Sequence, residues 1–222
     1  ERTGLTRAAD RRLLLTLQHL GYVRSEGRQF TLGPKVLQLG YGYLSTLDLT
    51  DITQPIVEAL SRQLNESCSL AVLDGHDIVY VARVPVRRIM TVSLGVGARL
   101  PAFCASLGRV LLGRKSDAEL RSWLAELKPE RFSAHTLVGK EKIRAAIEKA
   151  RRDGYCYVDQ ELELGLCSLA VPIRNQQGEI IAALNLSTPY RPDVAAYATG
   201  KCLPVLRKAA LAIEKSINAS GF

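Results

Sequence analysis

Ser106 lies in the segment of the chain that comes nearest to a catalytic motif. The run Ala105-Ser106-Leu107-Gly108 approaches the G-x-S-x-G turn that presents a nucleophilic serine between a strand and a helix. Cys104 replaces the first glycine of that pattern, and the order of expected strands and helices is not that of an α/β-hydrolase. A hydrolase that uses Ser106 is therefore an alternative that still needs a base.

The other residues that could perform catalysis or hold a metal are scattered. The histidines are three in number and show no metal-ligand spacing: His19, His76 and His135. The acidic residues 159, 161 and 163 alternate along one segment, which is more typical of a solvated strand than of carboxylate catalysis. The sequence contains no P-loop and no dinucleotide fingerprint. We therefore expect no enzyme activity, no metal and no cofactor.

The bulk properties favour a globular protein with an anionic partner. Hydrophobic residues make up 47% of the 222 residues, enough for a core. The net charge of +8 makes nucleic acid the first partner to consider. Five irregularly spaced cysteines indicate a reducing cytoplasm, and no segment reads as a signal peptide or membrane span. The chain begins at Glu1 rather than Met, as a fragment of a longer protein would.

The first part of the chain combines a basic helix with a basic hairpin. Thr6 is a good N-cap, leucines from Leu13 to Leu20 recur at helical spacing, and Gly21 ends the helix. Residues 22–32 then read as two short strands. Such a helix fits a major groove, and such a hairpin fits the phosphate backbone. The predicted DNA-contacting residues are Thr3, Thr6, Arg7, Arg11, Arg12, Arg24 and Arg28.

Two points limit that interpretation. Arginines opposite leucines are also typical of an ordinary solvated helix face. A helix-turn-helix also needs a preceding helix that packs on the recognition helix, and only four residues precede Leu5 here. The DNA-binding interpretation thus requires helices outside this chain.

The rest of the chain predicts an α+β domain built on an antiparallel sheet. Gly33-Pro34 starts a rather apolar linker helix that runs to Thr46. The helices expected beyond it are 51–64, 105–113, 117–127, 140–153 and a last one from 193 to 218 that bends near Pro204. The expected strands are 68–73, 78–84, 89–96, 155–159, 169–174 and 180–187. Ser116 and Glu119 form a predicted capping box.

The order of several short blocks resembles the IclR family of bacterial transcription regulators over essentially the whole chain. The blocks are Gly4-Leu5-Thr6-Arg7, Leu20-Gly21-Tyr22-Val23, Gly97-Ala98-Arg99-Leu100-Pro101-Ala102, Ser106-Leu107-Gly108-Arg109, Asp159-Gln160-Glu161, Gly165-Leu166-Cys167-Ser168, Ala170-Val171-Pro172-Ile173 and Ala183-Leu184-Asn185-Leu186-Ser187. Within the family, the sequence looks most similar to the branch that regulates aromatic-acid catabolism (protocatechuate, 4-hydroxybenzoate, β-ketoadipate).

The resemblance implies a partial winged helix-turn-helix in residues 1–32, a linker helix in 33–47 and a GAF-like effector domain in 48–222. It also implies a homodimer or tetramer that binds a double-stranded DNA operator and a small carboxylate effector, with no membrane partner. The implied role is a ligand-responsive DNA-binding regulator. The alternative is a small-molecule sensor that acts through protein partners.

The resemblance further implies a carboxylate pocket. Backbone groups at Ser106 and Leu107, at the start of a helix, would meet the carboxylate. The polar side chains would come from Asp159, Ser168, Asn185 and Ser187, and the apolar wall from Ile89, Val92 and Leu100. Without the resemblance, the polar residues would read as the half-exposed face of a strand. The chain departs from the family pattern at Arg109, where lysine is common, at Ser168, where cysteine is common, and at Asn185, where serine is frequent, which leaves the identity of the acid open.

Overall fold

The computed structural model describes residues 3–27, 29–46, 49–86 and 94–219. The chain divides into two compact units, residues 1–48 and 49–222. We describe each unit by itself.

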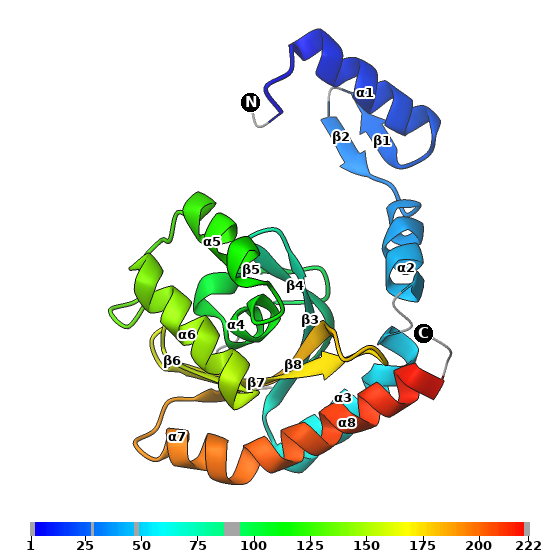
Figure 1. Cartoon of the computed structure of the whole chain (residues 1–222). Helices are drawn as coiled ribbons and strands as arrows, with labels where there is room; N and C mark the ends of the chain where they lie inside the picture. Colours follow the sequence, from blue (N-terminus) through cyan, green and yellow to red (C-terminus); the bar gives the residue numbers. More distant parts are fainter. Residues whose placement is uncertain (1–2, 28, 47–48, 87–93, 220–222) are drawn as a thin grey trace. The chain divides into compact units, whose positions relative to one another are not determined.

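The first unit is a helix, a hairpin and a second helix (Figure 1). Its elements are α1 (Arg7–His19), β1 (Val23–Glu26), β2 (Gln29–Leu32) and α2 (Val36–Thr46). The Thr6 hydroxyl accepts a hydrogen bond from the amide of Ala9, so the predicted N-cap is present. Gly21, at φ +81°, ends α1 in a Schellman motif, because its amide bonds to the carbonyl of Gln18 and the amide of Tyr22 to that of Leu17.

The second unit contains a six-stranded antiparallel sheet in the order β5-β4-β3-β8-β7-β6. The strands are β3 (Ser67–Asp74), β4 (Asp77–Val84), β5 (Arg99–Pro101), β6 (Cys156–Asp159), β7 (Leu166–Arg174) and β8 (Ile180–Pro189). The predicted strand 89–96 is only partly testable, since 89–93 lie outside the described residues. Its described end, 94–96, is not a strand, and the edge strand is β5, beyond the φ +86° turn at Gly97.

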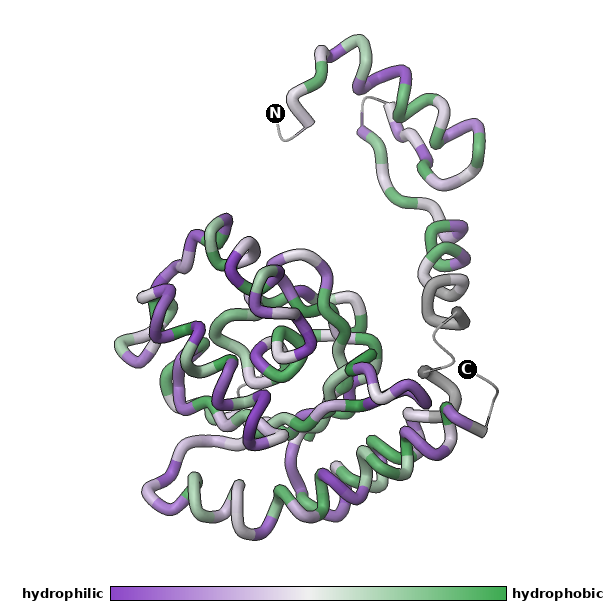
Figure 2. Tube along the Cα trace, in the orientation of Figure 1, coloured by the Kyte–Doolittle hydropathy of each residue, from purple (hydrophilic) through white to green (hydrophobic). Residues whose placement is uncertain are grey.

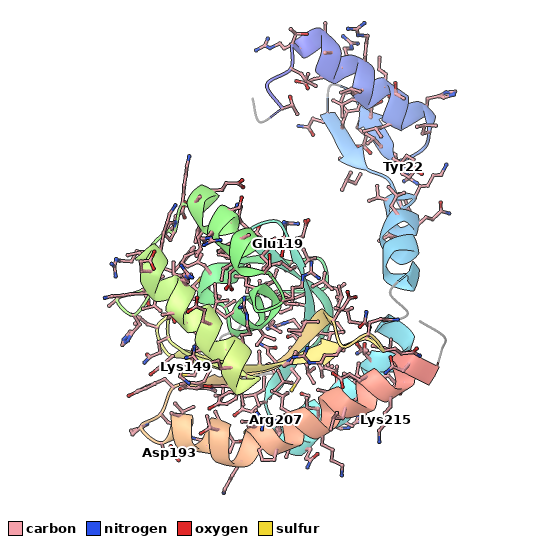
Figure 3. All side chains as sticks on the ribbon, viewed as in Figure 1. Tyr22, Glu119, Lys149, Asp193, Arg207 and Lys215 are labelled. Atoms are coloured by element: carbon pink, nitrogen blue, oxygen red, sulfur yellow. The ribbon has the colours of Figure 1, made fainter. Side chains whose placement is uncertain are left out.

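Helices cover both faces of this sheet (Figure 1). One face carries α3 (Leu49–Leu64) and α8 (Leu203–Ala219), and the other carries η1 (Ala102–Cys104), α4 (Ser106–Leu112), α5 (Asp117–Glu126) and α6 (Lys140–Asp153). Hydrophobic residues concentrate in the strands, whereas much of α6 is hydrophilic (Figure 2). Lys215 shows the same division on α8, where its exposed side chain points away from the sheet (Figure 3).

Local signals explain the ends of these helices. The capping box of α5 is complete, since the Ser116 hydroxyl accepts from the amide of Glu119 and the Glu119 carboxylate accepts from the amide of Ser116. The predicted bend near Pro204 is a π-helical segment, η2 (Tyr197–Cys202), between α7 (Val194–Ala196) and α8. Pro204 has no N–H to donate to the preceding turn, which accounts for the irregular helix at that point.

The chemistry of the core agrees with the expectation of reduced thiols. All five cysteines are free and buried. No helix in the described part of the chain is both long and apolar enough to cross a membrane.

Candidate functional site: a polar cavity on one face of the sheet

A cavity of about 630 Å³ lies on the face of the sheet that carries α4. Its volume is within the range usual for small-molecule sites, roughly 300–1,000 Å³. Its walls come from the sheet, from η1 and the start of α4, and from residues 162–166, which precede and open β7. The residues that line it include Ser67, Tyr80, Arg83, Leu100, Cys104, Ser106, Leu107, Phe132, Val158, Leu162, Ser168, Asn185 and Ser187.

The strand register gathers polar side chains on the cavity face. Ser187 of β8 pairs with Ser67 of β3 on one side and with Ser168 of β7 on the other. One step along, Asn185 pairs with Ser69, which in turn pairs with Arg83. Because cross-strand partners point to the same face, these residues form two polar rows across the sheet. A strand face directed into a core is ordinarily apolar, so these two polar rows are typical of a binding site for a polar ligand.

Arg83 supplies the positive charge of the cavity. Its Nη1 donates a 3.0 Å hydrogen bond to the Ser69 hydroxyl, and its guanidinium lies 5.3 Å from the ring centroid of Tyr80. The Nε atom of Arg83 is buried and has no hydrogen-bond partner among the described residues. Burial raises the pKa of Tyr80, and the charge of Arg83 opposes that rise.

Sequence reasoning missed Arg83. It lies in a strand that otherwise reads as a plain apolar run, Ile78 to Val84. The one available signal is that charge itself, since an arginine inside a central strand of an antiparallel sheet needs a reason to be there.

Two further polar atoms at the cavity are buried and have no hydrogen-bond partner in the described part of the chain. They are the Ser106 Oγ and the Asn185 Oδ1, while the Asn185 Nδ2 lies 3.4 Å from the Ser187 hydroxyl. Ser106 opens α4, which follows η1 closely because Gly108 packs on Ala102. A Cβ at position 108 would lie 2.1 Å from the Ala102 carbonyl oxygen, so only glycine allows this approach.

The match to known families is decisive at this point. Residues 41–215 match the family model described as bacterial transcriptional regulator IclR C-terminal. The chain belongs to the IclR family. Regulators of this family bind DNA operators and small-molecule effectors, so a cavity with unmatched polar atoms is the expected location of an effector.

Individual relatives agree with this assignment. The Pca regulon regulatory protein of Pseudomonas putida is 45% identical over 206 residues, which are 92% of this chain and 71% of that protein. A structure from Rhodococcus sp. RHA1, described as a transcriptional regulator, has a TM-score of 0.82 and 48% identity, covering 97% of this chain and 86% of that one. An IclR homologue from Microbacterium hydrocarbonoxydans, solved with 4-hydroxybenzoate, has a TM-score of 0.82 and 26% identity, covering 98% and 88%.

The structure brings together most of the predicted effector residues and separates one. Six of the nine line the cavity: Leu100, Ser106, Leu107, Ser168, Asn185 and Ser187. Ile89 and Val92 lie outside the described residues. Contrary to expectation, Asp159 is not among the residues that line the cavity. Strand alternation turns Val158 inward and Asp159 to the opposite, exposed side, where its carboxylate lies 3.2 Å from the Cys167 thiol.

The cavity of this IclR-family protein lacks the parts of a hydrolase. The Ser106 hydroxyl has no hydrogen-bond partner among the described residues, and so has no base that could activate it. Burial raises the pKa of the neighbouring Cys104 thiol to about 12, with the charge of Glu161 adding to the rise and that of Arg109 opposing it. A thiol held protonated in this way is a poor nucleophile. The relatives are named as regulators.

The predicted DNA-contacting residues occupy the first unit. Exposed arginines stand on α1 and β1: Arg7, Arg11, Arg12 and Arg24. Thr6 caps α1, and Thr3 donates to the Asp10 carboxylate at 2.9 Å. Arg28 lies outside the described residues. Gln18 ties α1 to the hairpin by a 2.9 Å bond to the Ser25 hydroxyl.

The leucines that recur at helical spacing along α1 and its C-cap are exposed in this unit, Leu13 by 54%, Leu17 by 40% and Leu20 by 47%. A single helix and a two-stranded hairpin offer too little surface to bury that face. Tyr22, labelled in Figure 3, directly precedes the hairpin, and the Lys35 ammonium lies 5.1 Å from the centroid of its ring.

Proposed function

We propose that this protein is a DNA-binding transcription regulator whose second unit senses a small carboxylate of the aromatic or ring-cleavage-derived class. The observation that carries the proposal is the set of buried cavity atoms that lack a hydrogen-bond partner among the described residues: Arg83 Nε, Ser106 Oγ and Asn185 Oδ1. Each buried polar atom left without a partner costs about 1–3 kcal/mol. A bound oxygen-rich anion would supply the missing partners and recover that free energy.

The shape of the cavity indicates how such a ligand would lie. The carboxylate would pair with Arg83, since a guanidinium and a carboxylate match in charge and geometry. An aromatic or aliphatic body would pack on Phe132, Leu162 and Leu100, which line the same cavity. Hydroxyl groups of the ligand would meet the serine row, Ser187 and its cross-strand neighbours. The relative solved with 4-hydroxybenzoate supports this ligand class.

The first unit would form part of a winged helix-turn-helix. In this proposal α1 enters a major groove, and the β1–β2 hairpin lies on the phosphate backbone. The exposed arginines form no ion pair with another described residue, so they are free to contact phosphates. The exposed leucines of α1 would pack on the preceding helix that this motif requires.

Ligand binding would act on DNA through an oligomer. Leu37 and Leu39 of α2 are exposed by 75% and 59%, which favours burial of this helix in a homodimer or tetramer. A ligand that prefers one arrangement of the protomers would shift the spacing of two DNA-binding units. Sedimentation with and without ligand measures the oligomeric state.

Two binding measurements test the proposal. Calorimetry with hydroxybenzoates and ring-cleavage dicarboxylates should find a ligand whose affinity falls in the Arg83→Met variant. Fluorescence anisotropy of the chain with its upstream DNA should show sequence preference and a salt slope. Absence of both a preference and a slope would exclude DNA binding and leave the alternative, a sensor that acts through protein partners.

Matched variants separate the two units. We expect Arg11→Ala to weaken DNA binding and to reduce the salt slope by about 1, because one phosphate contact is lost. Arg121→Ala, which removes an exposed arginine of the second unit, is the control and should leave DNA binding unchanged. Ligand affinity should stay the same in both variants. Equal loss of ligand and DNA binding in Arg11→Ala would contradict separate roles for the units.

A further inference from the structure

A buried ion pair joins α4 to the segment that borders the cavity. Arg109 of α4 makes a two-pronged contact with Glu161, with Nη1 2.6 Å from Oε1 and Nη2 2.7 Å from Oε2. The side chains are 4% and 8% exposed. The Arg109 Nε donates to the Phe103 carbonyl at 2.9 Å, so the same guanidinium also holds η1. Neither residue is among those that line the cavity.

Glu161 is held from several sides. Its Oε2 accepts from the amide of Leu137 at 3.1 Å, and its backbone carbonyl accepts from the hydroxyls of Thr136, at 2.6 Å, and Ser133, at 3.3 Å. The pair therefore stands where three segments meet: 102–112, 131–137 and 160–166. Each of these segments contributes to the cavity wall, through Ser106, Phe132 and Leu162.

The backbone next to the pair has an uncommon conformation. Gln160 has φ +57°, a left-handed conformation that is uncommon outside glycine and persists only where the surroundings enforce it. Its side-chain Oε1 accepts from the amide of Gly165 at 2.9 Å, and its own amide donates to the Leu166 carbonyl. This turn ends the strand alternation after Asp159 and directs Glu161 into the interior, with residues 162–166 left as the border of the cavity.

We propose that Arg109 and Glu161 are positioning residues that hold residues 160–166 as the rim of the effector cavity and so set its affinity for ligand. This proposal rests on the proposed function of the cavity. A buried ion pair often contributes little net stability compared with apolar residues of the same size. What it supplies is a fixed geometry, since a guanidinium fork and a carboxylate meet in few orientations.

The test uses the full chain and three variants. Glu161→Gln leaves Arg109 without its counter-charge, and Arg109→Lys keeps the charge but loses the fork. The double variant Arg109→Met/Glu161→Leu leaves no buried charge, so it should fold even where the single variants are unstable. The control is Glu148→Gln, which breaks a partly exposed pair on α6 with an Arg144 Nε to Glu148 Oε1 distance of 2.8 Å.

Hydrogen exchange without ligand is the first measurement. We expect the rim amides, at residues 137, 160, 165 and 166, to exchange about tenfold faster in all three variants, equivalent to ~1.4 kcal/mol of local opening. Amides in β3 and β8 should keep their protection in the double variant, as should all amides in Glu148→Gln. Unchanged rim exchange in the double variant, or equal acceleration in rim and sheet, would overturn the proposal.

Affinity for 4-hydroxybenzoate, measured by calorimetry, is the second readout. The double variant should bind about tenfold more weakly than wild type while its melting temperature stays close to wild type. A purely structural pair would instead lower the melting temperature and leave the affinity of the folded protein unchanged, which would also overturn the proposal. If wild type itself binds no 4-hydroxybenzoate, the proposed ligand class fails, and rim exchange still decides the role of the pair.

Discussion

The two faces of the central sheet are built from the same strands but differ in packing and polarity. In β8, Leu184 and Leu186 point toward α3 and α8 and are fully buried. Their neighbours Asn185 and Ser187 point to the other face and line the cavity. One face is filled by its own side chains, whereas the other leaves space and unmatched polar atoms.

Because of this difference, neighbouring residues of one strand contribute to different properties, one to stability and the next to ligand binding. The filled face gains from close packing and loses when any methyl group is removed. The cavity face is less closely packed, and its buried atoms Arg83 Nε, Ser106 Oγ and Asn185 Oδ1 have no hydrogen-bond partner among the described residues. Substitutions on the two faces should therefore move different quantities, the free energy of unfolding on one and the affinity for ligand on the other.

The largest expected effect is on the filled face. Leu184→Ala removes a side chain that is 0% exposed, and we expect it to lower the free energy of unfolding by about 3 kcal/mol. Urea denaturation measures this. Ser187→Ala, three residues along the same strand on the cavity face, should change stability by less than about 1 kcal/mol. Comparable losses in the two variants would show that both faces carry the fold equally.

The second largest effect is expected on the cavity face, where a substitution should change ligand affinity more than stability. Arg83→Met should weaken carboxylate binding by about 30-fold, equivalent to ~2 kcal/mol, because a charge-assisted hydrogen bond is lost. Stability should change by no more than about 1 kcal/mol, since the contacts that Arg83 makes with described residues are one hydrogen bond to Ser69 and the approach to the Tyr80 ring. Arg144→Met on α6 is the matched control. A large loss of stability with unchanged affinity would assign Arg83 to the core.

Much of the cavity face could be predicted, for reasons that the strands make clear. Alternation along β8 places Asn185 and Ser187 on one face, and the glycine-centred turn before β4 fixes the β3–β4 pairing. The family resemblance supplied Ser106, Leu107 and Ser168. What sequence could not supply was the register between β3 and β8, which is a long-range pairing, and it is this register that places Asn185 in the same row as Arg83, with Ser69 between them.

Asp159 shows the opposite limit. It lies in a block of polar residues and was expected at the cavity, but strand alternation places it on the face opposite Val158, which lines the cavity. The left-handed backbone at Gln160 then ends the alternation, and Glu161 is the acidic residue of this block that is buried. A non-glycine residue in that conformation leaves no clear mark in the sequence, because tertiary contacts enforce it.

A smaller effect tests whether the unmatched atoms contribute to binding. Ser106→Ala removes one buried hydroxyl that lacks a partner, so stability should stay the same or rise. Ligand affinity should fall about fivefold, equivalent to ~1 kcal/mol, if the hydroxyl bonds to the ligand. Calorimetry and thermal denaturation on the same samples give both quantities. An unchanged affinity would remove Ser106 from the binding site and leave Arg83 and Asn185.

The smallest expected effect tests whether water is excluded from the cavity face as it is from the filled face. Burial raises the pKa of Cys68, on the filled face, and of Cys104, at the cavity, from 9.0 to about 12 in each case. Between pH 9 and pH 12 the unfolded thiol ionises while the folded thiol keeps its proton. Each thiol's contribution to stability is therefore complete below pH 9 and is lost as pH rises.

Urea denaturation at pH 7.5 and pH 9.5 measures that loss, which is about 0.8 kcal/mol per thiol at the higher pH. We expect Cys104→Ala and Cys68→Ala each to reduce the pH dependence of wild type by this amount. Val158→Ala, a substitution at the cavity without a titrating group, is the control and should lower stability equally at both pH values. If only Cys68→Ala reduces the pH dependence, water already hydrates the Cys104 thiol. The cavity face would then hold water that a ligand must displace. The two faces would differ in hydration as well as in polarity.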